Sequence, residues 1–74
     1  MKLVEVEWDD ARFRFDWEEG ATLECAVMVT VGWVVEDSET LLAIASERDS
    51  QIPGTYRGVT SIPRANVRSM KVRR

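Results

Sequence analysis

Alternation of apolar and polar residues is the dominant pattern along this chain, and it is typical of half-buried β-strands. Near the N-terminus the alternation runs from Leu3 to Trp8 and again from Arg12 to Trp17. Asp9-Asp10-Ala11 separates the two runs, and aspartates favour turns because their side chains hydrogen-bond nearby backbone. The pattern therefore predicts a first hairpin with its turn at residues 9–11.

The longest predicted strand spans residues 23–36, and it is apolar on one face and mixed on the other. A strand that is apolar on both faces is covered on both sides. In a chain of 74 residues we expect the second cover to come from another subunit. Gly32 favours a bend or bulge in this strand. We expect Trp33 to lie in the core and Cys25 to have a packing role. The row assigned to one face is Leu23, Cys25, Val27, Val29, Val31, Trp33 and Val35.

The second half of the chain predicts shorter elements. A turn at 36–39 precedes a strand over 40–48, and a loop at 49–55 contains Pro53-Gly54. A strand over 56–62, a single helical turn at 63–66 and a last strand over 67–72 follow. The predicted fold class is all-β. We expect one domain over residues 1–74, a small closed barrel of five to six strands, Sm-like or Src-homology-3-like, with a short helical turn before the last strand.

The amino-acid composition limits the kinds of catalytic and metal-binding site that the chain can form. The chain has one cysteine and no histidine, so no internal disulfide can form and the usual general base at neutral pH is missing. The four glycines are isolated, which leaves no phosphate-cradling motif. We therefore expect no enzymatic activity, no cofactor and no metal site. Small domains are commonly stabilised by disulfides, a metal ion or a partner subunit. We therefore expect a homo-oligomer.

Charge is divided unevenly along the sequence. Through Asp49 there are thirteen acidic and four basic residues, a net charge of −9, whereas the remainder has six basic residues and no acid, a net charge of +6. Three interpretations stay open: an anion site such as RNA or a nucleotide, contact with the acidic surface of a neighbouring copy, or solvated charges on strand faces.

Aromatic and guanidinium groups are the strongest binding candidates. Trp8 and Trp17 flank the predicted first hairpin, where they either close the barrel mouth or stack on a flat ligand. Guanidinium groups bind phosphate in two-pronged fashion, and an aromatic ring can stack on a base. The candidate ligand-binding residues are Trp8, Trp17, Tyr56, Arg57 and Arg64.

Motifs in the second half resemble the Sm-like small barrels. Val31-Gly32-Trp33-Val34 with Asp37 and Leu41 is similar to their bent strand, acidic turn and apolar strand, and Arg57-Gly58 with residues 62–67 is similar to their last hairpin. The resemblance implies a small barrel and RNA as a possible ligand. Two features depart from it: Leu41-Leu42-Ala43-Ile44 replaces the asparagine that many Sm proteins use on RNA bases, and no N-terminal helix is predicted.

A second resemblance covers nearly the whole chain. Residues 8–11, Trp17, residues 31–37, Gly58 and Ile62-Pro63 resemble small bacteriophage and prophage proteins of unknown function. This resemblance implies a phage origin and a location in the host-cell cytoplasm. The acidic N-terminus and the absence of a long apolar run agree with a cytoplasmic rather than a membrane protein.

Two binding functions from different classes follow as hypotheses. The first is a non-enzymatic phage-type binding protein, an oligomeric barrel that sequesters a host factor, in its sharper form a nucleotide immune signal, or blocks a host protein sterically. The alternative is an Sm-like RNA-binding protein that uses the basic C-terminal strand.

Overall fold

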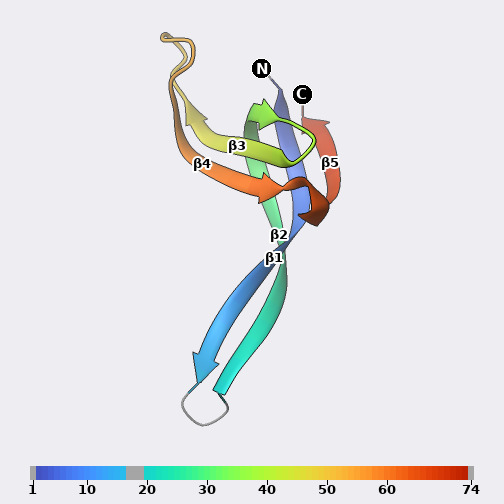
Figure 1. The fold of residues 1–74 in the computed structure, drawn as a ribbon. Helices are drawn as coiled ribbons and strands as arrows, with labels where there is room; N and C mark the ends of the chain where they lie inside the picture. Colours follow the sequence, from blue (N-terminus) through green and yellow to red (C-terminus); the bar gives the residue numbers. More distant parts are fainter. Residues whose placement is uncertain (1, 17–19, 74) are drawn as a thin grey trace.

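One curled antiparallel sheet forms the molecule. The structure is a computed structural model, which describes residues 2–16 and 20–73, and the side chains of residues 2–11 and 25–73. Five strands form one sheet in the order β4-β3-β2-β1-β5, and the 3-10 turn η1 precedes β5 (Figure 1). The all-β class and the helical turn are confirmed. The elements are β1 (Leu3–Asp16), β2 (Gly20–Asp37), β3 (Leu41–Arg48), β4 (Tyr56–Pro63), η1 (Arg64–Asn66) and β5 (Val67–Arg73).

The strands from β1 to β4 follow one another as a meander, and β5 returns to pair with β1. The predicted strands over 40–48, 56–62 and 67–72 are confirmed to within a residue, as is the loop between β3 and β4. Within the described ranges no ladder joins β4 to β5. The structure therefore establishes a five-stranded sheet but does not show the sheet closed into a barrel.

The predicted first hairpin is wrong. β1 runs without a turn through residues 9–11, which pair with residues 25–27 of β2. The apolar positions shift from even to odd numbers after Trp8, beside the two aspartates that favour a turn. In the structure it marks the point where β1 leaves the core, since the pairing of β1 with β5 also ends at Trp8.

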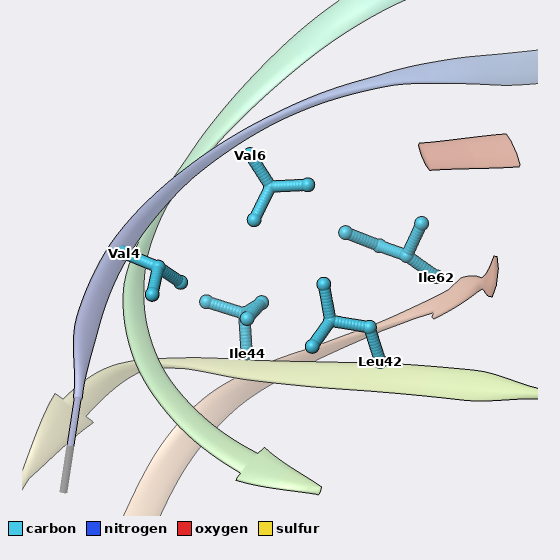
Figure 2. Packing of buried hydrophobic residues seen from close by; sticks show 5 residues of the cluster. All are labelled: Val4, Val6, Leu42, Ile44 and Ile62. Atoms are coloured by element: carbon cyan, nitrogen blue, oxygen red, sulfur yellow. The ribbon is translucent and has the colours of Figure 1, made fainter. Parts of the chain in front are cut away.

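The core is built from five fully buried aliphatic side chains that point toward one another (Figure 2). Adjacent strands lie about 4.8 Å apart, so a flat sheet would separate β1 from β4 by roughly 14 Å. Contact between side chains of these two strands therefore requires a strong curl. The cluster consists of Val4 and Val6 from β1, Leu42 and Ile44 from β3, and Ile62 from β4.

The face of β2 that was predicted to be buried points outward. Val27, Val29 and Val31 are 51%, 59% and 49% exposed, and Cys25 is exposed as well. Trp33 is only half-buried and lies outside the core cluster, so its predicted core position is wrong. The opposite face of β2 turns inward because it carries small or short residues where the core strands approach.

Gly32 marks the sharpest of these approaches. It is buried, and a Cβ placed there would lie 2.2 Å from the carbonyl oxygen of Ala45 and 2.7 Å from Cγ2 of Ile44. Both atoms belong to β3, which passes over β2 at this point. Only glycine permits the contact. The register irregularity of the β2–β3 ladder lies further along β2, between Val34 and Glu36, rather than at Gly32.

We predict that Gly32→Ala destabilises the domain by at least about 3 kcal/mol, because backbone atoms must move to admit the methyl group. Gly54→Ala is the control: this loop glycine has a φ of 84° and nothing within 4 Å of an added Cβ. The Gly54→Ala variant should lose only roughly 1 kcal/mol of folding free energy, which is the cost of placing alanine in a left-handed backbone conformation. Urea denaturation followed by circular dichroism measures both, and equal losses would contradict the proposed close contact.

Candidate functional site

The outward row of β2 leads from the body of the domain onto a hairpin arm. β5 pairs with β1 only from Leu3 to Trp8, and β3 pairs with β2 only from Trp33 to Asp37. Beyond these points β1 and β2 are paired with each other alone and project as a twisted two-stranded arm (Figure 1). The molecule accordingly measures 52 × 22 × 21 Å. We name Val27, Val29 and Val31 the valine row: Val27 lies at the base of this arm, and Val29 and Val31 pair with Glu7 and Glu5, where β5 still flanks β1.

Acidic and basic residues that are distant in the sequence lie side by side in the fold. Glu5, Glu7 and Asp9 of β1 occupy the strand between the valine row and β5. Arg68 of β5 approaches Glu7 at 3.8 Å and Asp9 at 3.5 Å, and Arg73 approaches Glu5 at 3.6 Å. The uneven charge of the sequence is thus partly balanced by pairing of the acidic strand with the basic one.

Two of the predicted ligand-binding residues, Tyr56 and Arg57, lie together where β4 begins. Tyr56 pairs with Arg48 across the ladder, and Arg57 pairs with Glu47. Arg57 lines a hollow of about 150 Å³ and Tyr56 lines a second one of about 250 Å³, and both hollows include Arg48, Asp49 and Thr55. This end of the β3–β4 ladder is therefore a shallow, polar candidate site, which we name the loop site.

Arg48 is a member of the loop site that sequence reasoning missed. Its guanidinium carbon lies 5.2 Å from the centre of the Trp33 ring, within the range of a cation–π contact. The sequence signal that could have identified Arg48 is its place at the end of a predicted strand, directly before the loop that leads to Tyr56 and Arg57. A cation held over an aromatic ring is partly immobilised, which favours its use in binding.

Arg64 is held by the turn between β2 and β3. Its guanidinium pairs with the Asp37 carboxylate, and its Nε donates to the backbone oxygen of Ser38 at 3.2 Å. Its backbone nitrogen also donates to the oxygen of Thr40 at 3.0 Å. These contacts tie η1 to the preceding turn, so Arg64 has a structural role in addition to any contact with a ligand.

Trp8 packs against the core cluster from the base of the arm. Its indole nitrogen donates to Oγ1 of Thr30 at 2.9 Å, which satisfies its polar atom. Trp17, the other tryptophan predicted to contact a ligand, lies outside the described residues.

The structure does not bring the predicted ligand-binding residues into one place within a single copy. Tyr56 and Arg57 lie at one end of the β3–β4 ladder, and Arg64 follows Pro63 at the other end. Seven residues of strand separate the two ends by roughly 23 Å. Any site that used all of them would require more than one subunit.

Comparison with known proteins produced no match, neither to a family model nor to a curated protein nor to a solved structure. In the described part of the chain no cluster of three or more cysteine, aspartate or glutamate residues is placed to hold a metal ion. No helix among these residues has the length and apolar character needed to cross a membrane.

We predict that the Trp8–Thr30 hydrogen bond contributes about 1 kcal/mol to folding. Trp8→Phe, Thr30→Val and the double variant form a mutant cycle whose coupling energy isolates this contact. Urea denaturation at pH 7 gives the three free energies of unfolding. Strictly additive losses would show that the indole nitrogen is energetically free for another partner.

Proposed function

We propose that this protein is a non-enzymatic binding protein of the bacteriophage type that works as a homo-oligomer in the host cytoplasm. It holds a host factor in a stoichiometric complex, or blocks it sterically, without changing it chemically. A barrel-like closure of the curled sheet is part of this proposal. The observation that carries it is the valine row, which leaves three neighbouring apolar side chains of β2 about half exposed.

Binding rather than turnover is supported by the residues available. A chain without histidine and with a single thiol lacks the common acid–base and nucleophilic pairs. An exposed apolar row next to charged strands instead has the composition of a protein contact surface. The likeness of the motif order to small phage proteins suggests the infected cell as the setting.

The ligand class that suits the loop site best is a nucleotide. Arg48 and Arg57 offer two guanidinium groups for phosphate, and Tyr56 offers a ring for a base. The acidic neighbours Glu47 and Asp49 select against polyanions such as long RNA and suit a small ligand that also presents hydroxyl groups. In an oligomer, Trp8 and Arg64 of other copies are available to complete the contact.

The basic strand β5 gives less support to RNA binding. Two of its cations, Arg68 and Arg73, face carboxylates of β1. Phosphate binding there would have to displace these ion pairs, and the acidic row beside β5 would repel the RNA backbone. We therefore favour the small-ligand function.

We predict that a nucleotide of the cyclic or ADP-ribose type raises the melting temperature of the protein and is recovered unchanged. Arg57→Gln should weaken binding by about tenfold or more, the loss of one charge-assisted contact. Calorimetry against a nucleotide panel measures affinity and stoichiometry, and chromatography of the released ligand tests for turnover.

Lys71→Gln is the matched control, because it removes the same charge from exposed β5. It should leave the affinity unchanged if the loop site is the binding site. A panel without any thermal shift would refute the nucleotide ligand, and conversion of a nucleotide to product would refute the non-enzymatic function.

A further inference from the structure

The molecule exposes more surface than a folded monomer of its mass. A compact protein of 8.5 kDa is expected to expose roughly 4,700 Å², whereas this chain exposes 5723 Å². Its radius of gyration of 14.9 Å likewise exceeds the roughly 11 Å expected for a chain of this length. The excess of about 1,000 Å² is close to the roughly 800 Å² that each partner buries in a standard protein interface.

The arm is the part of the molecule that extends away from the body of the sheet. A two-stranded hairpin is marginally stable by itself in water and needs a third strand or a packed face. The arm has neither within one copy, since β1 and β2 pair only with each other there. Its outward face carries the exposed Cys25 and Val27, and the valine row continues along β2 to Val31, on a stretch that has no neighbour on its β3 side.

Four sheet edges are open in the described structure, and only one lacks protection against pairing. The edge of β1 beyond Trp8 carries Arg12 and Arg14. Natural proteins block edge pairing with lysine, arginine, proline or irregular backbone. The β5 edge carries Arg68, Lys71 and Arg73, and the β4 edge carries Arg57, Pro63 and Gly58, whose φ is 64°. By contrast, β2 from Gly20 to Gly32 contains no lysine, arginine or proline, and Glu24 is its one charged residue.

We propose that the occupant of this edge is a second copy of the chain, whose β2 pairs antiparallel with β2 across a twofold axis near the valine row. The two sheets then form one continuous sheet through the two arms. This inference rests on the proposed homo-oligomeric function and specifies which surface forms the oligomer.

The register of such a pair is restricted by the alternation of side chains. Directly opposite residues of antiparallel strands lie on the same face. If odd-numbered residues oppose odd-numbered ones, the valine rows of the two copies merge into one apolar surface. A register shifted by one residue would set each valine beside an inward-facing residue of the other copy and divide that surface.

Charge also favours edge pairing over stacking of the two outward faces. Edge pairing gives the strand order β1-β2-β2-β1, so the acidic rows of the two copies lie roughly 14 Å apart. That distance exceeds the screening length of about 8 Å at physiological salt. Stacking of the outward faces would bring Glu5, Glu7 and Asp9 close to the other copy's acids, at a cost in free energy.

A cysteine scan of the full chain tests the inference. Native Cys25, and Val27→Cys, Val29→Cys or Val31→Cys in a Cys25→Ser background, each provide a single thiol on the outward row. In a twofold antiparallel pair, the residue at the axis lies within disulfide range of its own copy, whereas a residue two positions away is separated by roughly 13 Å. Mild oxidation should therefore give a covalent dimer at one position and background at the other three.

Val59→Cys in the same background is the control, because Val59 on β4 is 53% exposed, as open as the valine row. It should give background cross-linking only. Equal cross-linking at all positions, or a maximum at Val59, would overturn the inference.

A charge placed on the edge gives a second measurement. Val29→Lys should weaken self-association by at least about tenfold, because each copy loses an apolar cross-strand contact beside the new ladder and gains a like charge near the axis. Val59→Lys should leave it unchanged. Sedimentation equilibrium measures the constants, and circular dichroism confirms that both variants fold.

The outcomes separate this inference from the function on which it rests. If wild type is an oligomer that neither Val29→Lys nor the scan affects, the β2 edge is wrong and the homo-oligomeric function stands. If wild type sediments as a monomer at 100-fold the concentration used for ligand binding, both fail.

Discussion

The contact between the β3 backbone and Gly32 of β2 is the constraint on which the rest of the structure depends. Without a side chain at Gly32, the carbonyl of Ala45 comes close enough for β3 to pass over β2. That passage lets Leu42 and Ile44 meet Val4 and Val6 on the far side of the sheet. The pairing of β2 with β3 ends at Trp33, beside this contact, and the remainder of β2 continues away from the core toward the arm.

The elements were predictable where the sequence signals are local. Alternation, Pro53-Gly54 and the Pro63-Arg64 turn predict β3, β4, η1 and β5 to within a residue. The N-terminal half was less predictable because the same alternation describes two short strands or one long strand. Asp9 and Asp10 favour a turn locally, but a ladder of fourteen residue pairs with β2 outweighs that preference.

Which face of β2 points toward the core could not be inferred from hydrophobicity. The odd-numbered row is more apolar than the even-numbered row, and burial by transfer free energy alone would place it inside. The even-numbered row faces inward because its smaller side chains leave room for the core: Gly32 lies opposite Val4, and Thr30 lies opposite Val6.

The candidate site was only partly predictable. Tyr56 and Arg57 are adjacent in the sequence, whereas Arg48 comes close to them only through the pairing of β3 with β4.

Stability and binding are linked through the arm. Among the described side chains the buried cluster has five members, and a domain of 74 residues has only a narrow margin of folding free energy. A hairpin in which two strands pair only with each other adds a conformational entropy cost against that margin. Its persistence as a regular ladder is therefore best explained if the arm gains its burial from a partner. The β2 edge from Gly20 to Gly32 favours an identical partner, because it carries a single charge, Glu24, and can pair with itself with little repulsion.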